Sequence, residues 1–439
     1  MPEIVFQTVK IGIISQQIGI FVPKLFLKFA IFEAVRSVRR AFRRISHYMK
    51  RLMKMAVSAC ILVISAVSAS AGTAQSDTVS AGVRFAYDVD FEMNFDNREF
   101  DHSHIFPSYT IFGARLTPAV GVSFTQKNGA RHRVMIGIDV MKDFGRSVDP
   151  SEYSDNRRNL DLFDEITIYY MFERRLGRTD FSLTAGIFPR RFAEGEYSTA
   201  FFSDSLRWYD NNLEGLLLKF RRPRSSFEVG CDWMGMAGVD SRERFMIFSA
   251  GKGSVSETVT LGYAAYMYHF AGSANAPGVV DNILVNPYVD FDFTGRTPLQ
   301  RLHLSVGWLQ SLQNDRELVH RYVAPGGAEL IAGIRNWNVG IENRLFFGGN
   351  MMPYYNTIGT GGEKYDNMLY MGDPFYRVRD MEGWHLYDRL EVFYAPRISR
   401  FLDLKVAAVL HFSGGYAGWQ QMVTLHFNLQ ELLGRIGEN

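Results

Sequence analysis

Residues 83–95 read Val-Arg-Phe-Ala-Tyr-Asp-Val-Asp-Phe-Glu-Met-Asn-Phe, and this stretch decides the fold class. Every odd-numbered position is apolar, while the even-numbered positions hold Arg, Ala, Asp, Asp, Glu and Asn. A helix would spread these polar side chains around its axis, whereas a strand places all the apolar ones on one face. The stretch predicts one strand of 13 residues. That is longer than the roughly five or six residues usual in soluble sheets and suits a tilted membrane crossing of roughly 9 to 11.

The same alternation recurs along the chain. The sequence predicts about sixteen strands, with a range of 14 to 18. They lie near residues 81–95, 109–126, 130–143, 162–174, 180–190, 212–221, 226–235, 243–251, 256–270, 283–294, 300–312, 327–336, 339–348, 386–397, 400–412 and 418–430.

The connections between these strands alternate in length. Long ones such as 96–108, 144–161, 191–211 and 349–385 follow most odd-numbered strands, and short ones such as 127–129 and 337–338 follow the even-numbered strands. A soluble sandwich has no reason to sort its turns in this way, whereas a transmembrane barrel has short periplasmic turns and longer extracellular loops. We therefore predict an all-β, closed antiparallel transmembrane barrel with both termini on the periplasmic side.

The chain from residue 72 to the end resembles a bacterial outer-membrane β-barrel of the porin type. Its last strand alternates Leu425, Phe427 and Leu429, similar to the aromatic-rich terminal strand that the barrel-insertion machinery recognises. Residues 431–439 depart from this pattern, because many porins end on that aromatic residue. The resemblance implies contact with outer-membrane lipid and raises the expectation of a homo-oligomer.

The front of the chain has the composition of a targeting segment. Residues 49–71 combine a short cationic region, an apolar run of about 14 residues and an Ala-x-Ala end, which predicts a signal peptide cleaved near Ala71. We interpret residues 1–48 as an over-extended start; the alternative is an amphipathic helix at a membrane surface. The predicted organisation is thus residues 1–48 outside the mature protein, a signal peptide over 49–71 and a barrel over 72–439.

Removing this front changes the charge of the protein. Residues 1–71 hold 11 of the 48 basic and 2 of the 46 acidic side chains, so the remainder carries 37 basic against 44 acidic ones, a net charge of −7. This acidic balance and the strand pattern give no reason to expect a nucleic-acid partner. The remainder has one cysteine, Cys231, and hence no internal disulfide.

Charged residues occupy the strand positions that alternation turns inward. Both signs occur in similar numbers, which favours a wet lumen without strong ion selectivity; salt-bridge ladders that stiffen the wall are the alternative reading. The resulting prediction is a porin-like channel for diffusion of small hydrophilic solutes. The candidate lumen-lining residues are Arg84, Asp88, Asp90, Glu92, Arg133, Asp139, Glu165, Asp290, Asp292, Arg301, Glu342, Arg344, Arg389 and Glu391.

The longest connection, residues 349–385, is rich in glycine and tyrosine. Porins fold one loop inward as a constriction, and we expect this segment to do so, with Tyr354, Tyr355, Tyr370 and Tyr376 as candidates. A surface loop and a sugar-stacking site are the alternatives.

Two other function classes stay open. One is a barrel with a structural, adhesive or surface-polysaccharide assembly role. The other is a lipid hydrolase, because His411-Phe412-Ser413-Gly414-Gly415 resembles the His-x-Ser-Asn-Gly stretch of outer-membrane phospholipase A, with Gly414 in place of the Asn. Alternation turns His411 inward, away from the lipid, so we expect no enzyme, no catalytic residues and no cofactor.

Metal binding has one weak signal in the sequence. Asp96, Asn97, Glu99 and Asp101 could hold calcium in a loop, although an acidic solvated loop is the simpler interpretation. We therefore expect no metal.

Overall fold

The computed structural model describes residues 83–100, 108–144, 163–239, 241–275, 277–318, 320–377, 383–414 and 416–428. The predicted over-extended start, the signal peptide and its cleavage site lie outside these residues, as does the tail 431–439. Those assignments stay predictions.

Strands make up most of the described chain. They are β1 (Val83–Glu99), β2 (Tyr109–Thr125), β3 (Arg131–Asp143), β4 (Phe163–Leu176), β5 (Thr179–Pro189), β6 (Asn212–Arg222), β7 (Ser225–Gly235), β8 (Arg244–Ser254), β9 (Val259–Phe270), β10 (Val280–Asp292), β11 (Arg301–Asp315), β12 (Gly326–Asn336), β13 (Val339–Gly348), β14 (His385–Tyr394), β15 (Arg397–Ser399), β16 (Leu402–Ser413) and β17 (Tyr416–Asn428). The described helical pieces are α2 (Asp204–Tyr209), α3 (Asp366–Leu369), η2 (Arg190–Phe192) and η3 (Pro374–Arg377).

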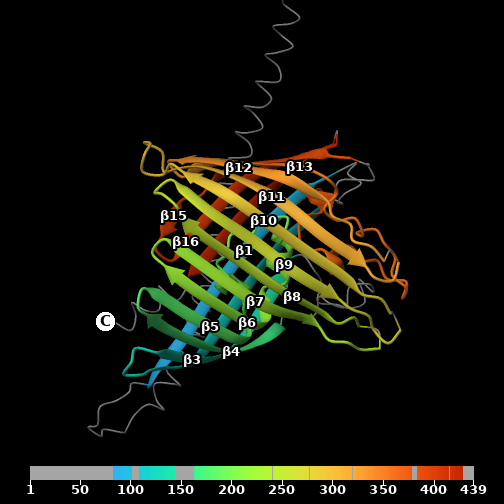
Figure 1. Cartoon of the computed structure of the whole chain (residues 1–439). Helices are drawn as coiled ribbons and strands as arrows, with labels where there is room; N and C mark the ends of the chain where they lie inside the picture. The colour runs from blue at the N-terminus through green and yellow to red at the C-terminus, as the bar shows by residue number, and fades with distance from the viewer. Residues whose placement is uncertain are drawn as a thin grey trace, which may run out of the picture. The chain divides into compact units, whose positions relative to one another are not determined.

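The strands close into a barrel (Figure 1). Each pairs antiparallel with its neighbours in sequence, and β1 pairs with both β2 and β17, so that among the described strands no edge is left free. The three-residue β15 continues the line of β14, because both pair with β16. The wall therefore has sixteen strands, and the predicted strand number and antiparallel closure are confirmed.

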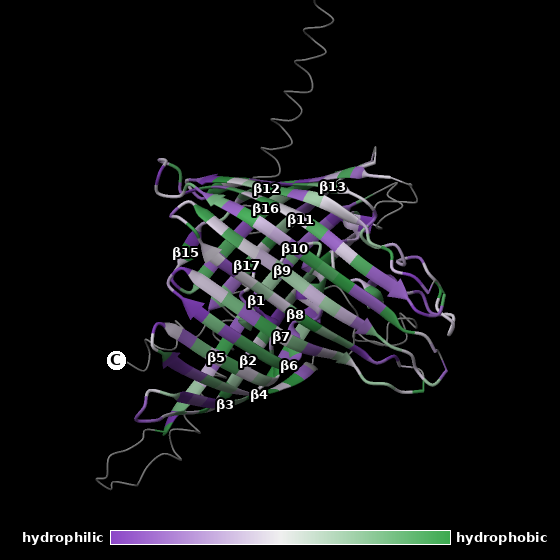
Figure 2. Ribbon diagram, in the orientation of Figure 1, coloured by the Kyte–Doolittle hydropathy of each residue, from purple (hydrophilic) through white to green (hydrophobic). Residues whose placement is uncertain are grey.

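The outer face of the wall is apolar, as alternation requires. On β3, Ile136 is 55% exposed while the neighbouring Met135 is 2% exposed, and residue hydropathy alternates along the strands (Figure 2). Within the described residues, no helix is long and apolar enough to cross a membrane.

Aromatic side chains form bands near both rims of the barrel, where lipid headgroups meet hydrocarbon. At the short-turn end, ring contacts run from strand to strand through Phe124, His132, Phe172, Phe181, Phe220 and Phe227. At the long-loop end, such contacts join Phe95, Phe112 and Phe144, then Trp233, Phe245 and His269, and then Phe347, Trp384 and Trp308.

Two connections at the long-loop end pack against the inner wall. We call residues 190–211, between β5 and β6, the strap, and residues 349–377, after β13, the inner loop. The strap crosses the inner loop where Ser203 N donates to the carbonyl of Met371 and Asp373 N donates to that of Thr199. The strap was not expected to fold inward; the inner loop was.

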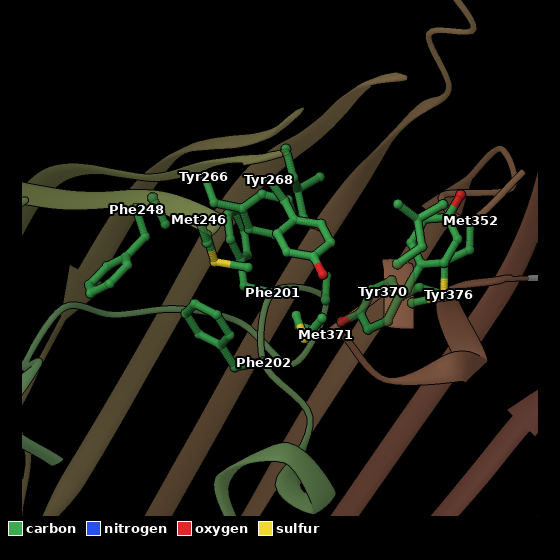
Figure 3. Close-up of a cluster of buried hydrophobic side chains, with 14 of the residues drawn as sticks. Phe201, Phe202, Met246, Phe248, Tyr266, Tyr268, Met352, Tyr370, Met371 and Tyr376 are labelled. Atoms are coloured by element: carbon green, nitrogen blue, oxygen red, sulfur yellow. The ribbon is translucent and has the colours of Figure 1, made fainter. Parts of the chain in front are cut away.

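The interior at this end is a packed core. Phe201 and Phe202 of the strap meet the inward side chains Tyr266 of β9 and Phe248 of β8, and Met352, Tyr370 and Met371 of the inner loop belong to the same buried cluster (Figure 3). Tyr354, Tyr355, Tyr370 and Tyr376 are all buried in this cluster, with 7% exposure at most. The prediction of a water-filled lumen therefore does not hold at the long-loop end.

Candidate functional site

Charges on the strap reach three parts of the wall. Arg191 pairs with Asp88 on β1 at 2.7 Å and lies 3.8 Å from Asp90. On the other side Glu194 pairs with Lys219 on β6 at 2.8 Å, and Glu196 pairs with Lys252 on β8 and accepts a hydrogen bond from Tyr288 on β10. These ion pairs hold the strap across the interior.

Other predicted lumen residues belong to a second charged group on β2, β3, β4 and β6. Asp139 is fully buried and pairs with Arg115 at 2.5 Å. Asn212 donates to both Asp139 and Glu165, at 3.0 and 2.7 Å. Arg133 pairs with Glu173 at 2.9 Å nearer the short turns. This part of the wall fits the salt-bridge reading, since Asp139 and Arg133 each pair with a charge of opposite sign, while Glu165 is held by the Asn212 amide.

The rest of the predicted lining is divided between the two ends of the barrel. Arg84, Asp292 and Arg301 are exposed near the short turns, while Glu92 and Asp290 are half-buried. Arg344 lies 3.5 Å from Glu342 and donates to Thr199 of the strap, and Arg389 pairs with Glu391 at 2.8 Å.

A chain of linked polar side chains lies near the long-loop rim, where the first strand meets the last ones. His411 on β16 bonds through Nε2 to the amide oxygen of Gln420 on β17 at 2.7 Å and through Nδ1 to the hydroxyl of Tyr387 on β14 at 2.9 Å. Gln420 in turn donates to Asp96 Oδ1 at 3.1 Å, and Arg98 holds Asp96 Oδ2 through two nitrogens. We call these five residues the rim network.

Aromatic rings seal the rim network. The ring of Phe375, in the inner loop, stacks on His411 with centroids 4.5 Å apart and on Tyr387 at 5.3 Å, and Phe100 meets both Phe375 and His411 edge-on. His411 is 1% exposed. A ligand can reach it only after a covering ring such as Phe375 or Phe100 has moved.

A buried hydroxyl lies beside the rim network. Ser413 follows His411 by two residues on the same face of β16 and is the direct cross-strand partner of Tyr387. Directly paired residues have Cβ atoms about 4.5–5.5 Å apart. The Ser413 hydroxyl is buried and makes no hydrogen bond to the described residues. It is thus a buried hydroxyl next to Tyr387 that the other described side chains leave unbonded.

Two aspartates of the inward segments face the arginines around the network. Asp204 in α2 lies 3.7 Å from Arg389. Burial disfavours its charge, but nearby guanidinium groups, Arg389 first, outweigh that and lower the pKa of Asp204. Burial raises the pKa of Asp373, which Arg98 and Arg389 only partly offset. The strap and the inner loop therefore bring acidic groups to a cationic part of the wall.

The loop interpretation of Asp96 is wrong. β1 continues to Glu99, and Asp96 is a wall residue, 1% exposed and paired with Arg98 at 2.6 Å. It belongs neither to a solvated loop nor to a calcium loop, and Asp101 lies outside the described residues. Among the residues that the structure describes, no group of three or more His, Cys, Asp or Glu side chains could hold a metal ion.

Sequence reasoning singled out His411 and Ser413 but missed Gln420 and Tyr387. Their partnership depends on the register between β14, β16 and β17, which local patterns do not encode. The inward fold of the strap did have a signal. Tyr266 and Tyr268 alternate with outward apolar residues on β9, so this strand is apolar on both faces near the rim, as expected where the inner wall is covered.

The closed wall, its apolar outer face and its two aromatic bands define an outer-membrane β-barrel. The model of the lipid A 3'-O-deacylase-type family matches residues 82–435, so the chain belongs to that family. Among curated proteins, none matches this chain.

Solved structures with a similar architecture are porins and related barrels. They include a loop-deletion form of OmpT from Vibrio cholerae, at 8% identity and a TM-score of 0.44, covering 79% of this chain and 99% of that one. A mutant porin of Rhodopseudomonas blastica has 12% identity and a TM-score of 0.38, covering 78% and 99%. OpdL of Pseudomonas aeruginosa has 8% identity and a TM-score of 0.40, covering 78% and 98%.

Family membership corrects two predictions. The porin-like channel for small hydrophilic solutes is wrong as the main function, and so is the expectation that the protein is not an enzyme, because the family is one of lipid A deacylases. The reason for the error is physical: inward charges suggest the lining of an open pore, whereas the strap bonds to several of them and Tyr376 of the inner loop donates to Glu329. The lipid-hydrolase alternative is the one that the family supports.

Proposed function

We propose that this protein is an outer-membrane hydrolase that removes an ester-linked acyl chain from lipid A, and that the rim network is its active site. The observation that carries the proposal is the family match over residues 82–435, which spans every strand of the network. Lipid A is an acylated and phosphorylated sugar, so its ester groups lie where headgroup meets hydrocarbon. The long-loop rim lies at that depth on the extracellular side.

The chemistry follows from the side chains present. Ester hydrolysis needs a nucleophile and a base that accepts its proton. Ser413 supplies the hydroxyl and His411 is the base. The Tyr387 hydroxyl bonds to His411 Nδ1 and passes the proton on once bound substrate has brought the Ser413 hydroxyl to it. Hydrogen bonds of this kind are often incomplete without substrate, so the unpaired Ser413 hydroxyl is compatible with the role.

In the first step the Ser413 oxygen attacks the acyl carbonyl carbon. The proton of Ser413 passes to Tyr387 as the Tyr387 proton passes to His411. The sugar oxygen leaves with that proton when the carbon–oxygen bond to the sugar breaks. Water then hydrolyses the acyl-serine by the same proton route, releasing the fatty acid. Atoms and charges balance without a redox partner.

The experiment compares folded variants on lipid A in mixed micelles. We expect wild-type protein to release one class of acyl chain, seen by mass spectrometry as a lighter lipid A and a free fatty acid. His411→Gln and Ser413→Ala should each abolish the release. The matched control is His426→Gln, since His426 lies on β17 nearer the short turns and bonds to Asp90 at 2.6 Å. Full activity of both rim variants would remove the rim network from the proposal.

A further inference from the structure

We propose that Asp96 and Gln420 are positioning residues that hold His411 in one tautomer, with its proton on Nε2 and its basic Nδ1 turned toward Tyr387. This inference rests on the function proposed above. It goes beyond it by assigning the direction of every hydrogen bond in the rim network.

The direction is set at the β1 end of the network. Asp96 accepts from Arg98 Nε and Nη2 at 2.8 and 2.6 Å, and its other oxygen faces the Gln420 side chain at 3.1 Å. An ionised carboxylate can only accept hydrogen bonds. Gln420 must therefore turn its NH₂ group to Asp96, and its amide oxygen is left facing His411 Nε2 at 2.7 Å.

The same logic fixes the histidine. An amide oxygen can only accept, so His411 Nε2 must carry the proton. A neutral imidazole has one N–H, so Nδ1 is the acceptor and the Tyr387 hydroxyl donates to it at 2.9 Å. His411, Gln420 and Asp96 are each no more than 4% exposed, so water does not compete for these bonds.

The direction of these hydrogen bonds affects how well His411 can act as a base. When Nδ1 gains a proton, the imidazolium charge is stabilised through Gln420 by the Asp96 carboxylate. If the Gln420 amide were turned over, His411 would carry its proton on Nδ1 and could not accept one from Tyr387. Wrong-tautomer defects of this kind cost on the order of 10⁴-fold in rate in a well-studied hydrolase.

The tautomer can be measured independently of activity. We would label the folded full chain with ¹⁵N-histidine in micelles and assign His411 by the signal lost in His411→Gln. The expected spectrum has a protonated Nε2 and an unprotonated Nδ1. A protonated Nδ1 in the wild type would overturn the inference, whatever the activity on lipid A.

Variants then test whether the direction of the hydrogen bonds in the rim network affects the rate of acyl release. The amide side chain introduced by Asp96→Asn can accept or donate, so the Gln420 amide is free to turn over. We therefore expect both His411 tautomers to be populated. The rate of acyl release should fall on the order of 10²-fold or more, mainly through kcat. The matched control is Asp90→Asn, which alters another histidine contact between the same two strands and should leave activity unchanged. Unaltered tautomer and activity in Asp96→Asn would contradict the inference.

A rescue variant separates positioning from general packing and keeps the test decisive if Asp96→Asn does not fold. In the double variant Asp96→Asn with Gln420→Glu, position 420 carries an acceptor-only carboxylate, and the amide introduced at position 96 donates to it. The Nε2–H tautomer should return, with activity within about tenfold of wild type because the bond to His411 keeps its direction. A folded double variant with the Nε2–H tautomer but no recovery would overturn the role in the reaction. If instead the wild type releases no acyl chain, the proposed function fails, while the wild-type spectrum still decides the tautomer.

Discussion

At the residue scale, side-chain alternation decides what each wall position meets. Ile136 points outward from β3 and faces lipid. His411 points inward from β16 and is buried inside the barrel. The sequence predicted both orientations because the period of two is local. It could not predict that His411 meets Gln420 and Tyr387, because those contacts depend on the pairing of three strands.

Ile136→Arg tests the outward assignment. Because this position is 55% exposed on the lipid face, we expect the charge to cost about 2–4 kcal/mol if it lies near mid-bilayer and to reduce the folded, heat-modifiable species on gels. Ile136→Leu keeps the position apolar and should fold normally. Equal folding of the two variants would place Ile136 away from lipid.

At the element scale, the strap and the inner loop decide what the barrel contains. The sequence indicated that residues 349–385 would fold inward, from their glycine and tyrosine content. The strap's own residues carry no such signal, because Arg191, Glu194 and Glu196 have the composition of a solvated loop; the signal lies in the wall, where β9 is apolar on both faces. These residues lie inside the barrel because each forms an ion pair with an oppositely charged residue on a different strand.

The crossing of these two segments has a sharp steric test. A Cβ on Gly372 would lie 2.0 Å from the carbonyl oxygen of Ala200 in the strap. Gly372→Ala should therefore force the segments apart and cost about 1–3 kcal/mol, read as a lower melting temperature. Gly349→Ala is the control, since its Cβ would meet nothing closer than 3.5 Å. Equal melting temperatures would mean that the two segments do not touch there.

Phe375 is predicted to act as the cover of the rim network. Phe375→Ala should expose His411, so that a histidine-modifying acylating reagent labels it faster, as mapped by peptide mass spectrometry. The truncation also costs about 3–5 kcal/mol of packing, as does Phe201→Ala elsewhere in the core, and that control should leave His411 protected. Protection of His411 in both variants would show that another group covers it.

At the scale of the whole molecule, closure of the barrel builds the rim network. Asp96 and Arg98 come from β1, whereas Gln420, His411 and Tyr387 come from β17, β16 and β14, so the network exists only once β1 pairs with β17. The sequence predicted the closed barrel from strand alternation and turn lengths. The same patterns could not predict the function, because an inward charged residue has the same sequence pattern whether it lines an open pore or a packed interior.

Because the interior is packed, we predict that the protein conducts no ions across a lipid bilayer. Wild-type protein that is folded by gel mobility should give no channel events in a planar bilayer, because the strap and the inner loop fill the long-loop end. A variant with residues 191–210 replaced by a short Gly-Ser linker should show events if it still folds. Regular conductance steps from the wild type would mean that a water path passes these segments.

The most direct measurement of the central claim is lipid A hydrolysis in ¹⁸O-labelled water. We predict that lipid A incubated with the folded protein loses one acyl chain, and that the released fatty acid carries ¹⁸O in its carboxyl group while the sugar does not, because attack is at the acyl carbon. Lipid A of unchanged mass after incubation with folded wild-type protein would contradict the assignment of this barrel as a lipid A deacylase.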